Sequence, residues 1–168
     1  MNTTTISNSI THHEQDKFRT ISLTALLTGI LQIASIVLKY LIENGRGPLS
    51  LFKYIASGVF GKEALDGGIL MITWGLVIHF MIAFLCTVFL FLIYPGLSRW
   101  LKNKFLTGAL YGISIWAIMN FIVLPLSKIN KLPTGTNEAI LAASLLVLTI
   151  GMPTALIANW YYTKKKRA

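Results

Sequence analysis

The feature of this sequence that most constrains its fold is an uncharged apolar stretch from Gly67 to Ser98, GGILMITWGLVIHFMIAFLCTVFLFLIYPGLS. A transmembrane helix needs about 20 apolar residues to cross roughly 30 Å of hydrocarbon, and this stretch is longer. The composition agrees, because 54% of the residues are hydrophobic and only 12% are charged, whereas a soluble domain has about 25% charged residues. The sequence therefore predicts an integral membrane protein.

Four apolar segments predict four membrane-spanning helices, at about residues 20–41, 68–94, 105–127 and 138–162. Pro95 is expected to end the second helix and Pro153 to kink the fourth, because proline lacks a backbone N–H. We therefore predict an all-α fold, an integral membrane four-helix bundle that forms a single domain over residues 17–168.

The polar segment at residues 1–16 precedes the first span. It is rich in Thr, Ser and Asn, which is typical of a disordered tail and not of a cleavable signal peptide. His12 and His13 are adjacent within it, and adjacent residues do not share a helix face. We expect this pair to be solvated rather than to bind a metal ion.

The connection between the first two spans, residues 43–66, predicts a short helix outside the centre of the membrane. Ser50 is suited to cap such a helix. The segment is too short and too charged to cross a bilayer, so we expect an extracytoplasmic helix that is either interfacial or re-entrant. Lys62, Glu63 and Asp66 are then expected at the rim of the bundle.

The basic residues predict the orientation of the chain. Lys17 and Arg19 precede the first span, the loop at residues 99–104 carries three basic residues and the C-terminus four, nine in all, against six on the other side, where Lys39 at the end of the first span is counted with the two loops. Because cytoplasmic segments are enriched in Lys and Arg, both termini are expected in the cytoplasm. The C-terminal cluster is expected to contact the anionic lipid head groups of the bilayer rather than nucleic acid; it comprises Lys164, Lys165, Lys166 and Arg167.

Three polar side chains within the spans form the candidate binding site. Gln32 lies on a polar stripe of the first span, His79 on a small-residue face of the second, and Asn120 on a GxxxG face of the third. At about 1.5 Å of rise per residue, the three reach similar depths. We predict that they converge inside the bundle, beneath the outer helix. The faces comprise Thr24, Thr28, Gln32 and Ser35; Gly68, Gly75, His79, Ala83 and Cys86; and Gly108, Gly112, Trp116 and Asn120.

His79 has three interpretations. The first is a structural histidine that is hydrogen-bonded between helices. The second is a role in accepting a proton or binding a ligand, because a neutral imidazole can take up and release a proton near physiological pH. The third is ligation of a metal ion or of haem, and a haem held by two imidazoles would require a second His79 from a homodimer.

The remaining candidates are two tryptophans, and the sequence contains no catalytic motif. Trp74 and Trp116 are included in the candidate binding set, with core or lipid-facing packing as the alternative interpretation. No serine lies in a nucleophile elbow, and no glycine-rich phosphate loop is present. We therefore predict no catalytic residue, no metal site and no cofactor, and the sequence leans away from an enzyme.

The segments YIASGVFGKEALDGG, WGLVIHFMIAF and GALYGISIWAIMNFIVLPLS together resemble a family of small four-span proteins of the bacterial inner membrane whose function is unknown. The resemblance covers about residues 45–130. The residues that carry it are Tyr54, Ala56, Ser57, Gly58, Gly67, Gly68, His79, Phe80, Tyr111, Gly112, Asn120, Pro125, Leu126 and Ser127. It implies a multi-pass protein of the bacterial inner membrane, and it implies no activity.

Three functional classes follow from these observations. The first is a non-enzymatic protein that binds or assists a membrane partner, a lipid or an envelope component, either alone or as a homo-oligomer. The second is a conduit for protons or a small solute through Gln32, His79 and Asn120. The third is a haem or quinone redox subunit.

Overall fold

The computed structural model describes the backbone of residues 3–43, 49–129 and 135–167, and the side chains of residues 14–38, 49–129 and 135–164. All secondary structure in these ranges is helical. The elements are α1 (Thr3–Glu43), α2 (Leu49–Phe60), α3 (Glu63–Asp66), α4 (Ile69–Leu101), α5 (Lys104–Ile118), the π-helix η1 (Met119–Val123), α6 (Leu124–Leu126), α7 (Thr136–Leu146), the π-helix η2 (Val147–Gly151) and α8 (Met152–Arg167).

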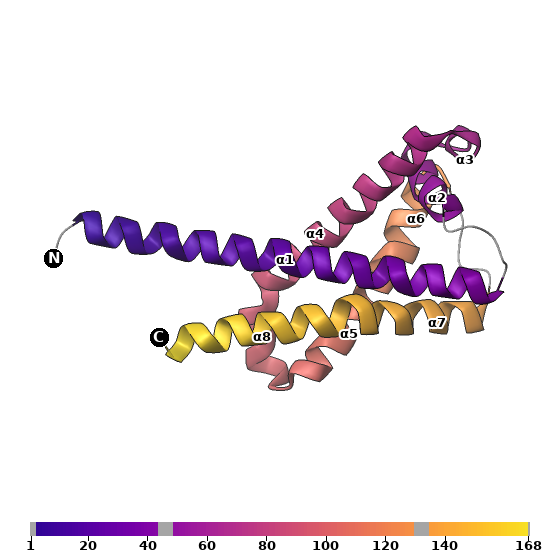
Figure 1. Cartoon of the computed structure of the whole chain (residues 1–168). Helices are drawn as coiled ribbons and strands as arrows, with labels where there is room; N and C mark the ends of the chain where they lie inside the picture. Colours follow the sequence, from indigo (N-terminus) through magenta and orange to yellow (C-terminus); the bar gives the residue numbers. More distant parts are fainter. Residues whose placement is uncertain (1–2, 44–48, 130–134, 168) are drawn as a thin grey trace.

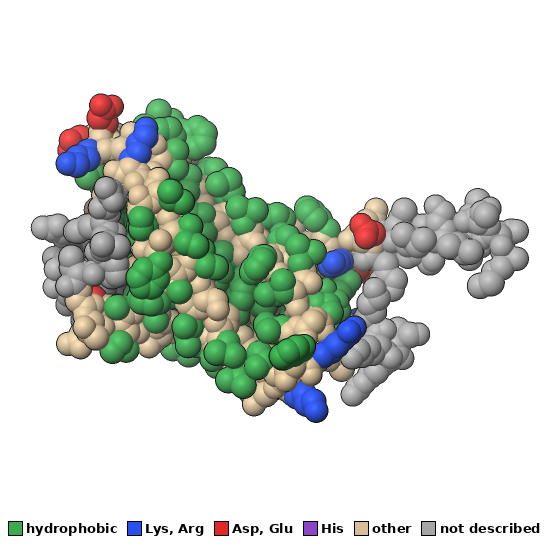
Figure 2. Space-filling model, turned by 180° about the vertical axis from the view of Figure 1, so that it is seen from behind, with side chains coloured by type: hydrophobic (Ala, Val, Ile, Leu, Met, Phe, Trp, Pro, Cys, Tyr) green, Lys and Arg blue, Asp and Glu red, His purple; other side chains and the backbone are tan. Residues whose placement is uncertain are grey.

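Four helical segments are long and apolar enough to cross a membrane: Glu14–Leu38, Ile69–Leu101, Lys104–Leu126 and Thr136–Lys164. They confirm the prediction of an all-α chain with four apolar helices suited to a membrane bundle. Both termini lie at one end of the molecule, and α2 and α3 lie at the other end (Figure 1). Hydrophobic side chains cover the middle of the face in Figure 2, and most of the charged side chains on that face gather toward the two ends.

Helix α4 holds the bundle together. It packs against α1, α2, α5 and α8, while α5 also packs against α7, η2 and α8. The core lies where α4, α5 and the fourth span meet, and it is built mainly of large apolar side chains. Its buried members include Leu90, Phe91, Tyr94, Ile115 and Ile150.

Glycines allow two close helix contacts. A side chain at Gly75 of α4 would overlap the backbone carbonyl of Phe52 in α2. A side chain at Gly151 of η2 would overlap the Gly108 carbonyl oxygen in α5, and one at Gly112 would overlap Val147. These contacts confirm the small-residue faces predicted for the second and third spans. The face of the second span is shorter than predicted, because Gly68 is exposed and Cys86 is half-buried.

Helix α4 continues through Pro95 to Leu101, whereas the sequence predicts an end at this proline. A proline has no N–H for the carbonyl four residues earlier, which is Phe91. The Tyr162 hydroxyl of α8 donates a hydrogen bond of 2.6 Å to that Phe91 oxygen. The freed carbonyl is therefore satisfied from a neighbouring helix, and α4 does not need to end.

Helix α1 also extends beyond its predicted limits. It begins at Thr3, so the backbone of residues 3–16 is helical where the sequence predicts a disordered tail. Extending an existing helix adds one hydrogen bond per residue without a new nucleus, which favours continuation from the apolar span. The side chains of His12 and His13, and those of residues 165–167, lie outside the described side chains.

Two π-helices each end two residues before a proline. The Leu124 N–H bonds to the Met119 carbonyl before Pro125, and the Met152 N–H bonds to the Val147 carbonyl before Pro153. The missing proline N–H interrupts the α-helical pattern at both places, and the wider turn redistributes the bonds. The predicted distortion at Pro153 is thus a π-helical segment.

Candidate functional site

His79 is buried on the packing face of α4, with 7% of its surface exposed. Its Nε2 atom lies 3.1 Å from the backbone carbonyl oxygen of Gly29 in α1. A carbonyl only accepts, so Nε2 carries the proton and donates it. The bond joins the first two spans near the middle of the bundle. This geometry fits the structural interpretation of His79.

Gly29 makes this bond possible. A side chain at Gly29 would lie 2.7 Å from the ring of Phe80, which is closer than real contacts. The absence of a side chain lets the backbone of α1 approach α4. Sequence reasoning missed Gly29. The signal that could have revealed it is a small-xxx-small pair with Ala25, beside the polar stripe of the same helix.

The polar stripe of α1 faces inward, as predicted. Thr24 and Thr28 are buried, and Gln32 and Ser35 are half-buried. The Thr24 hydroxyl donates to the Thr20 carbonyl at 2.7 Å, and the Thr28 hydroxyl donates to the Thr24 carbonyl at 2.9 Å. These hydroxyls are thus satisfied within their own helix and need no partner from a neighbouring helix.

The structure brings His79 close to the level of Gln32 but shows other partners for Asn120. Gln32 lies three residues beyond Gly29, about 4.5 Å along the axis of α1. Asn120 lies in η1, half-buried, and its Nδ2 donates to the Trp116 carbonyl at 2.8 Å. Within the described side chains, no hydrogen bond joins Gln32, His79 and Asn120 to one another. Their convergence stays a prediction.

The two tryptophans lie in different environments. Trp74 of α4 is 44% exposed, and its ring lies 5.7 Å from that of Phe60. Trp116 is half-buried, and its indole N–H is the one buried side-chain polar group in the described part of the chain without a hydrogen-bond partner. The ring of Trp116 packs edge-on against Phe121. Trp116 thus has an unused donor one turn before Asn120.

The predicted rim residues Lys62, Glu63 and Asp66 are all exposed, at the end of the bundle that carries α2. Helix α2 is fixed there by a hydrogen bond of 3.0 Å from the Lys128 N–H to the Gly58 carbonyl. This contact and the close approach at Gly75 attach α2 to both the second and the third span.

The described residues show no group of three His, Cys, Asp or Glu side chains that could hold a metal ion. A haem iron would compete with the Gly29 carbonyl for the Nε2 atom of His79. His79 and Asn120 both bond to backbone carbonyls.

Comparisons with protein-family models, curated proteins and solved structures find no match. The resemblance to a bacterial family therefore rests on the residues quoted above. Some of these residues meet in space. A side chain at Gly58 would lie 3.8 Å from Cβ of Ser127, and the neighbouring Lys128 N–H bonds to Gly58. The Tyr111 hydroxyl donates to the Cys86 carbonyl, which joins α5 to α4.

Proposed function

We propose that this chain is a non-enzymatic protein of the bacterial inner membrane that binds another envelope component through the end carrying α2 and α3. Both termini then lie in the cytoplasm, and α2 is an interfacial helix on the extracytoplasmic side. The excess of Lys and Arg toward the termini supports this orientation.

One observation carries the proposal: apart from the Trp116 indole N–H, the buried polar side chains in the described part of the chain bond to the backbone of the bundle itself. His79 bonds to Gly29, Tyr111 bonds to Cys86, and the buried hydroxyls of Thr87 and Thr154 bond to carbonyls of their own spans. Groups used in this way act as interhelical and intrahelical supports. They favour a rigid scaffold over a path for a solute.

The end that carries α2 offers a surface for a partner. Val59 is 52% exposed, and Phe60 and Trp74 beside it are also exposed. Charged side chains of α3 and of Lys62 flank this apolar group. Exposed apolar groups with a polar rim are typical of interaction sites, and the fixed position of α2 reduces the entropy lost on binding.

A photo-crosslinking amino acid at Val59 tests this proposal in native membranes. We expect a discrete protein adduct, because Val59 lies within the proposed contact surface. The matched control is Leu92, an apolar residue of α4 with 63% of its surface exposed. The control position is expected to yield lipid adducts only. The same adduct pattern at both positions would contradict a binding surface on α2.

A second experiment separates the scaffold from the conduit. The conduit hypothesis requires that His79→Ala abolishes flux through reconstituted vesicles. We expect instead that proton permeability is unchanged and that the free energy of unfolding falls by about 1 kcal/mol, the typical contribution of an interhelical hydrogen bond. Loss of a wild-type flux in the folded variant would establish the conduit in place of the scaffold.

A further inference from the structure

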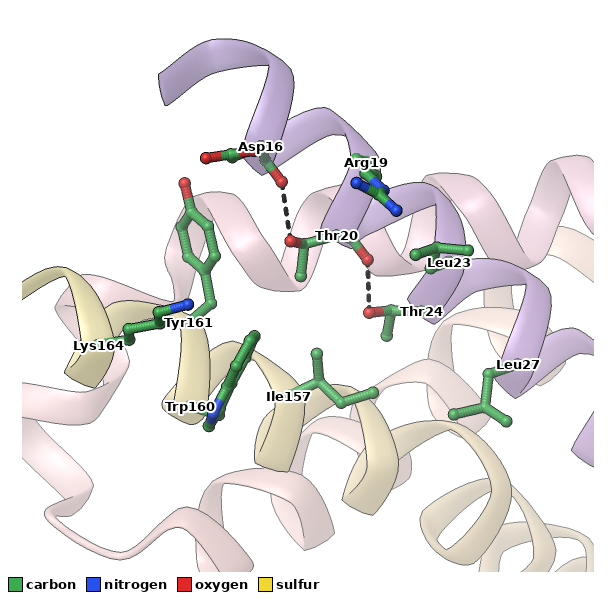
Figure 3. A pocket seen from close by; sticks show the side chains of 10 residues that line it. All are labelled: Asp16, Arg19, Thr20, Leu23, Thr24, Leu27, Ile157, Trp160, Tyr161 and Lys164. Carbon is green, nitrogen blue, oxygen red and sulfur yellow. Dashed lines mark hydrogen bonds between the residues drawn. The ribbon is translucent and has the colours of Figure 1, made fainter. Parts of the chain in front are cut away.

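A groove of about 630 Å³ opens between α1 and α8, at the end of the bundle that carries both termini (Figure 3). Its volume lies within the range of roughly 300–1,000 Å³ that is usual for small-molecule sites. Helix α1 lines one wall and α8 the other. The lining residues are Asp16, Arg19, Thr20, Leu23, Thr24, Leu27, Ile157, Trp160, Tyr161 and Lys164.

The chemistry of the groove changes along its length. Leu23 and Leu27 of α1 and Ile157 of α8 form an apolar part of the lining, Lys164 lies at the end toward the chain termini, and Arg19 lies one turn before Leu23 on α1 (Figure 3). Arg19 and Leu27 are eight residues apart, which is about 12 Å along a helix. One leaflet of hydrocarbon is about 15 Å deep. The groove therefore has the apolar length and the cationic mouth that a membrane lipid would match.

The charges at the mouth are not neutralised by ion pairs. Within the described side chains, Arg19 has no acidic partner, and the Nζ of Lys164 lies 5.3 Å from the ring centroid of Trp160. Asp16 is the single acid in the lining, and its backbone carbonyl accepts a hydrogen bond from the Thr20 hydroxyl. The charged lining side chains Arg19, Lys164 and Asp16 sum to one net positive charge, and Glu14, outside the lining, is close enough to Tyr161 to act on it electrostatically.

We propose that this groove binds an anionic phospholipid, with an acyl chain along Leu23, Leu27 and Ile157 and the phosphate at the mouth formed by Arg19 and Lys164. The planar guanidinium of Arg19 is suited to bidentate contact with a phosphate. Trp160 and Tyr161 are residue types that concentrate at head-group level. The site is at the opposite end from α2, so it does not depend on the proposed function.

Quenching of Trp160 by brominated lipids tests the site. The variant W74F/W100F/W116F leaves Trp160 as the single tryptophan, since the chain has four. In mixed vesicles, the mole fraction that gives half-maximal quenching of Trp160 is expected to be at least about fivefold lower for brominated phosphatidylglycerol than for brominated phosphatidylcholine. The reason is that one basic residue near a membrane surface contributes about that factor. Each protein is normalised to its emission in unbrominated vesicles.

Adding R19Q/K164Q to this variant should bring the two quenching curves together. The matched control is R99Q/K102Q, which removes two exposed cations outside the groove lining and should keep the preference. Equal quenching by both lipids in the parent variant would overturn the proposal. The proposal would also be overturned if R19Q/K164Q and R99Q/K102Q reduced the preference for brominated phosphatidylglycerol equally. It would likewise be overturned if neither lipid quenched Trp160 because a second copy of the chain covers the groove.

Native mass spectrometry of the protein with all four tryptophans in place gives an independent measurement of lipid binding. The wild-type protein and R99Q/K102Q are expected to retain bound phosphatidylglycerol in detergent, and R19Q/K164Q is expected to lose most of it. Retention of the lipid by R19Q/K164Q would overturn the assignment of Arg19 and Lys164.

Discussion

Gly151→Val is expected to remove the folded protein from the membrane, or to lower its unfolding temperature sharply. The added side chain would meet the backbone of Gly108 and Gly112 in α5. Backbone atoms have no rotamer through which to move aside, so the third and fourth spans must separate. Overpacking of this kind costs about 3 kcal/mol or more. Thermal unfolding in detergent, followed by fluorescence-detected size exclusion, measures the effect.

A graded series controls this experiment. Gly151→Ala should be less damaging than Gly151→Val. Gly96 lies within α4, and a side chain there would meet no atom within 4 Å. Gly96→Ala should therefore be neutral or slightly stabilising, because alanine favours a helix over glycine by about 1 kcal/mol. If Gly151→Val melts at the wild-type temperature, the contact between α5 and η2 is wrong.

Gly75→Val is expected to release α2 from α4 while the four long helices stay assembled. The new side chain would overlap the carbonyl of Phe52, and α2 is a short helix held at the end of the bundle. We expect hydrogen exchange of the α2 amides to rise about tenfold or more, as follows from a local destabilisation above 1.4 kcal/mol. The amides in the centre of α4 should keep their protection.

Gly68→Ala is the matched control for this variant, because Gly68 directly precedes α4 and a Cβ added there would meet no atom within 4 Å. It should leave the exchange of α2 unchanged. The crosslinked adduct at Val59 should also disappear in the Gly75→Val variant if α2 presents the proposed binding surface. Unchanged protection of α2 in Gly75→Val would contradict its close docking on α4.

Periodicity was sufficient to predict which sides of the spans face inward. Thr24 and Thr28 repeat at four residues, and so do Gly75, His79 and Ala83, and each set is buried. Such patterns predict burial, because small and polar side chains at helical spacing are enriched where membrane helices contact each other. Hydropathy was likewise sufficient to locate the four spans, but not the ends of α1 and α4, which extend beyond their predicted limits.

The partner of His79 could not be predicted from side-chain types. It is a backbone carbonyl, a group that every residue has, and its availability depends on how closely α1 approaches α4. The continuation of α4 through Pro95 has a similar cause, because it relies on a hydroxyl from the distant Tyr162. The groove at Arg19 depends on the separation of α1 and α8. These features arise from tertiary geometry, which one-dimensional spacing does not encode.

The hydrogen bond from Tyr162 to Phe91 has a consequence for biogenesis. The two residues are 71 positions apart, so the second span leaves the ribosomal exit tunnel long before Tyr162 does. Until then the carbonyl left open by Pro95 has no permanent donor, and α4 can bend there. The fourth span therefore completes the hydrogen bonding of the second span, which enters the bilayer two insertion steps earlier.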